Sequence, residues 1–157
     1  MNLLLVLHIL GAATWLGANV AQAFLGSMVV GASPEVRLWW SESGEKMAKV
    51  LYNVAGILVL ATGLGLVIGS SDPGGFSFAS AFVSIGFAAV IVGAVLGITV
   101  FAPKNRALAQ AIRDGDVEAE SKIRSTIMAF GLLDTLVVVF TIGAMVYKIG
   151  AKYKGLD

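Results

Sequence analysis

The sequence predicts an all-α fold: a bundle of four transmembrane helices in one domain that covers residues 1–157. Of these residues, 57% are hydrophobic and only 13% are charged, whereas a soluble domain carries about a quarter charged residues. The apolar residues also fall in four blocks near the ~20-residue length that crosses a ~30 Å hydrocarbon layer. We expect the transmembrane helices at about 3–30, 54–69, 78–101 and 125–147.

The first two blocks are joined by a polar segment. No Lys or Arg precedes the first block, so we interpret it as a retained helix and not as a cleavable signal peptide. Ser33, Pro34 and Glu35 are typical of a helix start. The stretch 36–52 mixes charges with a tryptophan pair, and indoles favour the headgroup level. We therefore expect an interfacial helix after helix 1, with a solvated linker as the alternative.

The other two connections differ in length. Residues 70–75 consist of turn-forming types and predict a short turn between helices 2 and 3. Gly115 predicts the end of a helix and Asp116 the start of the next. The pairs Glu118/Lys122 and Glu120/Arg124 have the spacing favoured on an exposed helix. We therefore expect a cytoplasmic helical hairpin between helices 3 and 4, with a charged tip that stands out of the membrane.

The basic residues predict the orientation of the chain. Eight of them lie in loops 31–53 and 102–124: Arg37, Lys46, Lys49, Lys104, Arg106, Arg113, Lys122 and Arg124. Three lie on the other side: Lys148, Lys152 and Lys154. Because cytoplasmic loops are enriched in Lys and Arg, both loops should be cytoplasmic and both termini outside.

Composition also limits the chemistry. The net charge of +1 gives no indication of a nucleic-acid partner. The absence of cysteine excludes disulfides, thiolate metal sites, iron–sulfur clusters and covalently attached haem. The partner that the sequence itself indicates is the lipid bilayer.

A polar stripe runs along helix 1. His8, Trp15, Asn19 and Gln22 are spaced by seven, four and three residues and therefore share one face, which should point into the bundle. Two interpretations of His8 stay open. In the functional interpretation, His8 is a ligand to haem or to a metal ion, or a proton-transfer group. In the structural interpretation, it is a neutral histidine hydrogen-bonded to a neighbour or to water.

Asp134 is an acidic residue inside helix 4, at the level of Trp15 and Asn19. In the structural interpretation, it accepts a hydrogen bond from the Trp15 indole or the Asn19 amide. In the functional one, Asp134 with Asn19 forms a proton or ion relay. Glycines repeat in helices 2 and 3, and we interpret such small faces as helix-packing seams.

A family resemblance adds to these expectations. It is carried by His8 to Gly17 (HILGAATWLG), by Leu60 to Gly65 (LATGLG), by Ala102 to Leu108 (APKNRAL) and by Met145 to Lys148 (MVYK). These segments resemble a group of small bacterial membrane proteins that includes CopD-type copper-resistance proteins, HemJ-type protoporphyrinogen oxidases and an uncharacterised family of similar size. The resemblance implies a location in the bacterial inner membrane.

Three functional hypotheses follow. The first is a non-catalytic packing or accessory subunit that associates with itself or with a larger membrane complex and binds haem or a quinone. The second, implied by the resemblance, is a haem-dependent redox enzyme of the HemJ kind, with haem b at His8 and Trp15 nearby. The third is a proton-coupled cation or copper transporter that uses Asp134.

Overall fold

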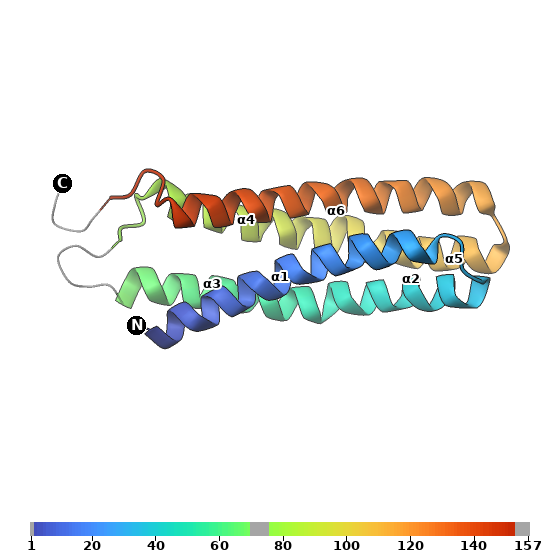
Figure 1. Cartoon of the computed structure of the whole chain (residues 1–157), viewed down its shortest axis with the longest axis horizontal. Helices are drawn as coiled ribbons and strands as arrows, with labels where there is room; N and C mark the ends of the chain where they lie inside the picture. The colour runs from blue at the N-terminus through green and yellow to red at the C-terminus, as the bar shows by residue number, and fades with distance from the viewer. Residues whose placement is uncertain (1, 70–75, 153–157) are drawn as a thin grey trace.

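The computed structural model describes residues 2–69 and 76–152, which form a bundle of long helices (Figure 1). The helical segments within this part of the chain are α1 (Asn2–Val29), α2 (Pro34–Lys49), α3 (Leu51–Gly69), α4 (Ala81–Leu96), the π-helical turn η1 (Gly97–Phe101), α5 (Ala102–Asp114) and α6 (Val117–Val146). The expected turn at 70–75 and the Lys154 used for the orientation lie outside the described residues.

Four helical stretches are long and apolar enough to cross a membrane: Asn2–Val29, Pro34–Gly69, Ala81–Asp114 and Val117–Val146. Large apolar side chains on them face outward; Leu3, Phe24 and Ile98, for example, are 70%, 66% and 75% exposed. Such a surface is unfavourable in water and suits contact with lipid tails. The predicted all-α fold with four long apolar helices is confirmed, and its architecture is that of a multipass membrane protein.

The second stretch begins with the helix that is expected after helix 1. This helix, α2, runs in line with α3 (Figure 1), and its expected interfacial position stays a prediction. Between the two helices, the regular pattern is interrupted at Val50, which has φ −109° and ψ −64°. Tertiary packing explains the straight path: the fully buried Ser41 hydroxyl of α2 donates to the Asn105 carbonyl of α5 at 2.7 Å. At ~1.5 Å per residue, these 36 residues extend about 54 Å, well beyond a ~30 Å hydrocarbon layer.

The ion pairs of the described residues gather at one end of the bundle, where α2, α5 and the start of α6 meet. Glu120 is buried and accepts from Arg37 of α2 at 2.7 Å and from Arg124 of α6 at 2.6 Å. The predicted pair Glu120/Arg124 is therefore confirmed, whereas Glu118 and Lys122 form no ion pair among the described residues. Since Glu120 holds two arginines from different helices, it ties α6 to α2.

The turn between α5 and α6 forms at the predicted residues. Gly115 has a φ of +69°, the left-handed conformation that ends a helix without a Cβ penalty. Asp116 then caps α6, and its carboxylate accepts from the Ala119 N–H at 2.9 Å. The turn therefore joins α5 to α6 at the predicted residues, and the position of this hairpin outside the membrane stays a prediction.

A π-helical turn lies between α4 and α5. The Ala102 N–H donates to the Gly97 carbonyl, five residues back. Pro103 follows, and a proline has no N–H and its ring clashes with the carbonyl four residues earlier, here that of Thr99. The wider turn accommodates the proline, so the helix expected at 78–101 continues to Asp114.

The helices pack unequally around the interior. α1 crosses the bundle at an angle and packs closely along α3, because a Cβ at Gly11 would lie only 2.8 Å from the Val59 side chain (Figure 1). The absence of a side chain at Gly11 therefore allows the close approach of these two helices. α3 and α4 make a looser seam than α1 and α3. That loose seam is where the candidate site opens.

Candidate functional site

Asp134 of α6 lies at the centre of a buried polar network. The residue is only 3% exposed, and its Oδ2 accepts two hydrogen bonds. The Trp15 indole N–H donates at 2.9 Å and the Asn19 amide donates at 2.8 Å. Both contacts that the sequence offered as alternatives are present together. The second oxygen, Oδ1, is buried and has no hydrogen-bond partner in the described residues.

Two further residues extend the network away from Asp134. The Tyr52 hydroxyl of α3 donates to the side-chain oxygen Oδ1 of Asn19 at 2.7 Å, and the Gln22 side-chain amide donates to the Tyr52 hydroxyl oxygen at 2.7 Å. Gln22 lies on the predicted polar face of helix 1, whereas Tyr52 belongs to the stretch 36–52 and is not part of the predicted stripe. The sequence feature that could have indicated this contact is the position of Tyr52 in the first turn of α3. When α1 and α3 run antiparallel, this position is level with Asn19. The network joins α1, α3 and α6.

A glycine holds the Trp15 indole in place. A Cβ at Gly93 of α4 would lie 2.1 Å and 2.4 Å from two carbons of the indole ring, distances that real Cβ atoms do not show. The ring therefore lies directly against the α4 backbone. The interpretation of the glycine face as a packing seam is correct at Gly93. At Gly97, by contrast, an added Cβ would meet nothing within 4 Å, and this glycine lines a cavity.

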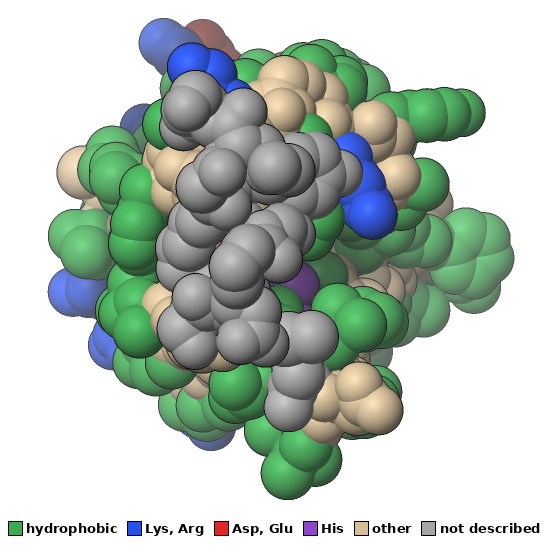
Figure 2. Space-filling model, turned by 90° about the vertical axis from the view of Figure 1, so that its left-hand side faces the viewer, with side chains coloured by type: hydrophobic (Ala, Val, Ile, Leu, Met, Phe, Trp, Pro, Cys, Tyr) green, Lys and Arg blue, Asp and Glu red, His purple; other side chains and the backbone are tan. Residues whose placement is uncertain are grey.

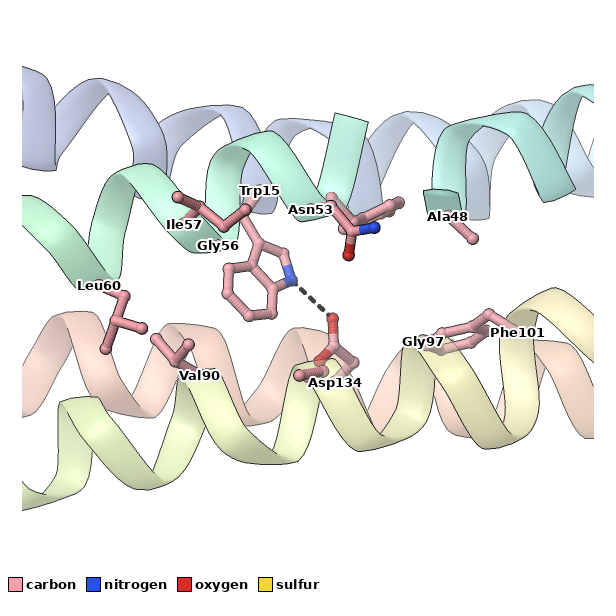
Figure 3. A pocket seen from close by; sticks show the side chains of 13 residues that line it. Trp15, Ala48, Asn53, Gly56, Ile57, Leu60, Val90, Gly97, Phe101 and Asp134 are labelled. Carbon is pink, nitrogen blue, oxygen red and sulfur yellow. Dashed lines mark hydrogen bonds between the residues drawn. The ribbon is translucent and has the colours of Figure 1, made fainter. Parts of the chain in front are cut away.

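The cavity has a volume of about 180 Å³ and lies between α3 and α4 (Figure 3). Its walls come from Tyr52, Gly56 and Ile57 of α3 and from the α4–η1 segment, while Trp15 and Asp134 line it from behind. The other lining residues are Ala48, Asn53, Leu60, Val90, Gly93, Ala94, Gly97 and Phe101. It is thus a mostly apolar space with one acidic side chain among its described lining residues, and it opens between two membrane-spanning stretches.

His8 lies apart from this cavity. Its Nδ1 is 3.1 Å from both the Val59 carbonyl oxygen and the Thr62 hydroxyl, and the carbonyl can only accept, so Nδ1 carries the proton. Along α3, the His8 ring lies against Gly63, whereas the Trp15 indole lies near Gly56, seven residues and about 10 Å away. The structure therefore does not bring His8 and Trp15 into one site.

The end of the bundle where α1 begins carries the histidine. Figure 2 views this end, where hydrophobic side chains form most of the circumference and the histidine is visible between them. Among the described residues, no three His, Cys, Asp or Glu side chains are grouped to hold a metal ion. A metal ion bound by His8 would need ligands that are not grouped with it in the described residues, whereas haem iron can be held by one histidine.

Fold and site together define a multipass helical protein with a buried carboxylate beside a lateral cavity. Comparison with family models, with curated proteins and with solved structures finds no match to this chain. Its function must therefore be inferred from its own residues.

Proposed function

We propose that this chain is a small, non-catalytic membrane subunit that binds a lipid-soluble molecule with a single-ring head group in the cavity between α3 and α4. The observation that carries the proposal is the cavity itself. It opens between two membrane-spanning stretches and leads to the buried side chains Trp15 and Asp134. A ligand dissolved in the bilayer would reach it sideways, without crossing the charged end.

The cavity volume sets the size of the head group. An apolar cavity of about 150 Å³ holds one benzene molecule, so about 180 Å³ accommodates one substituted six-membered ring. This size favours a single ring, of which a quinone ring is one example, over a porphyrin. A ligand tail would leave through the opening and lie in the lipid.

The lining residues support binding more than catalysis. Asp134 is the one acidic residue among the described residues that line the cavity, and its Oδ2 already accepts two hydrogen bonds. Acid–base catalysis needs a group that can exchange protons with substrate and then be restored. In the described residues, the polar network that runs from Gln22 to Asp134 does not continue past Asp134, because apolar contacts of Trp15 and Val138 lie there.

The proposal is tested with duroquinone, a tetramethyl benzoquinone that quenches tryptophan fluorescence. Ala94 is exposed and lines the cavity, so Ala94→Phe should fill the opening without disturbing the core. We expect saturable quenching in the unaltered protein and its loss in Ala94→Phe. Ala88→Phe, an exposed position elsewhere on α4, is the matched control and should keep it. Equal quenching in both variants would contradict the proposal.

The subunit role extends to partners and orientation. We propose that the protein lies in the inner membrane, with both termini outside and with the charged end, formed by α2, α5 and the start of α6, in the cytoplasm. We also propose that this charged end contacts a second copy of the chain or a larger complex. The support is the cluster of ion pairs at one end and the length of α2 and α3 beyond a hydrocarbon layer. Native mass spectrometry from detergent would detect either partner, and a strictly monomeric species would contradict this part.

A second candidate is a haem-dependent redox enzyme of the HemJ kind at His8. The supporting observation is the hydrogen bond from Nδ1–H to the Val59 carbonyl, which leaves the Nε2 lone pair available. Metal-ligating histidines commonly donate their other ring N–H in this way. A Soret band in the purified protein that is lost in His8→Ala would support haem b, and a colourless preparation would count against it.

The transport hypothesis stays a prediction. A proton or cation relay would need polar groups on both sides of Asp134, and in the described residues the network reaches only toward Gln22. A flux assay with Asp134→Asn would decide it, since an unchanged flux excludes a relay through this carboxyl group.

A further inference from the structure

We infer that the cavity beside Asp134 selects a positively charged organic head group, a single-ring ammonium, for which the Asp134 carboxylate is the counter-charge. This inference rests on the proposed ligand-binding function. It narrows the ligand class from ring-headed molecules in general to those that carry a cation.

The first argument is the hydrogen bonding of the Asp134 carboxyl group. Trp15 and Asn19 reach Oδ2 through N–H groups, which only donate, so Oδ2 cannot carry a proton toward them. Oδ1 is buried without a partner in the described part of the chain. Protonated, it would be a donor with no acceptor; ionised, it is an acceptor with no donor. Because Asp134 lines the cavity, a ligand N–H that reaches Oδ1 from there would satisfy the ionised form.

The second argument is the direction of the network. Gln22 donates to Tyr52, Tyr52 donates to Asn19, and Asn19 donates to Asp134. Every donor in this series points toward the carboxylate, and hydrogen bonds in series polarise one another. The arrangement therefore stabilises negative charge on Asp134.

The third argument is the absence of a counter-charge. The ion pairs of the described residues all lie at the charged end, and none includes Asp134. No Lys, Arg or His is among the described residues that line the cavity. A buried carboxylate is strongly disfavoured without a partner, so the ligand is the group that can supply the positive charge.

The walls suit an organic cation better than a hydrated metal ion. Trp15, Tyr52 and Phe101 line the same space as the carboxylate, and the faces of aromatic rings attract cations. Figure 3 labels Trp15 and Phe101 with Asp134. The remaining lining is largely aliphatic or glycine. A ring with an ammonium group would place its apolar part among these residues and its charge at Oδ1.

Two probes of almost equal size separate charge from shape. Benzylammonium carries the positive charge, and benzyl alcohol carries a neutral hydroxyl in its place. Binding is measured in lipid nanodiscs from the indole N–H resonance of Trp15, assigned by its loss in Trp15→Phe. We expect benzylammonium to bind about tenfold or more tightly than benzyl alcohol, the effect of a hydrogen bond to a charged group.

Variants then assign the selectivity to Asp134. Asp134→Asn should abolish the preference for benzylammonium while benzyl alcohol keeps its affinity, and the exposed control Asp114→Asn should change neither. Equal affinity for both probes in the unaltered protein, or an undiminished preference in Asp134→Asn, would overturn the inference and leave the proposed function intact. If neither probe nor duroquinone binds, the proposed function fails. If Asp134→Asn does not fold, the unaltered protein's preference and its loss in Ala94→Phe decide.

Discussion

Adding one methyl group at Gly93 should test how tightly the bundle depends on the position of Trp15. A Cβ there would lie 2.1 Å from the indole, about 1.3 Å short of the 3.4 Å where ordinary contact begins. The indole would have to move by roughly that distance, which would stretch its 2.9 Å hydrogen bond to Asp134 beyond bonding range. Overpacking costs about 1–3 kcal/mol, and an interhelical hydrogen bond in a membrane averages about 0.6 kcal/mol. We expect Gly93→Ala to destabilise the protein by about 2 kcal/mol or more.

The assay is reversible unfolding in mixed micelles by titration with sodium dodecyl sulfate. Gly97→Ala is the matched control, because it lies on the same helical stretch and a Cβ there meets nothing within 4 Å. That control should unfold at the same detergent fraction as the unaltered protein or slightly later, since alanine favours helix over glycine. If Gly93→Ala and Gly97→Ala unfold together, the indole is not fixed as the structure describes.

Three further outcomes are expected. Glu120→Gln should lower the free energy of unfolding by about 1–3 kcal/mol, because two arginines lose a buried partner, whereas Glu42→Gln, at an exposed ion pair, should change it by less than about 0.5 kcal/mol. Ser41→Ala should cost about 1 kcal/mol, because the Asn105 carbonyl loses its donor, and it too is measured by unfolding. Since the chain has no cysteine, Asp114→Cys and Lys152→Cys report the orientation directly. In intact cells, an impermeant thiol reagent should label only the second, and the reverse pattern would invert the proposed topology.

The long helices were predictable because their signal is local. In lipid, about twenty consecutive apolar residues must form their backbone N–H and C=O hydrogen bonds within the segment itself, whatever its neighbours are. The turn at Gly115 and Asp116 was predictable for the same reason, since the conformations of these residues depend on their own side chains. The path of α2 was not, because it depends on contacts such as that between Ser41 and Asn105, which lie far apart in the sequence.

The candidate site was predictable in part. The level of Asp134 relative to Trp15 and Asn19 follows from helix rise and direction, and the contacts are present. The cavity could not be predicted, because it depends on how loosely α3 packs against α4, and small residues are compatible with both a tight seam and a gap. The roles proposed for His8, Trp15, Asn19 and Asp134 stay predictions.

The π-helical turn at Gly97–Phe101 has a geometric consequence for the whole rod from Ala81 to Asp114. One additional residue in a turn rotates everything after it by about 100° relative to a regular helix. The upstream half can thereby direct its buried face toward α6, while the downstream half directs Leu108 and Ile112 inward at the charged end. Deleting a single residue from this turn would leave the composition of the helix almost unchanged and yet rotate the buried face of its downstream half away from the interior.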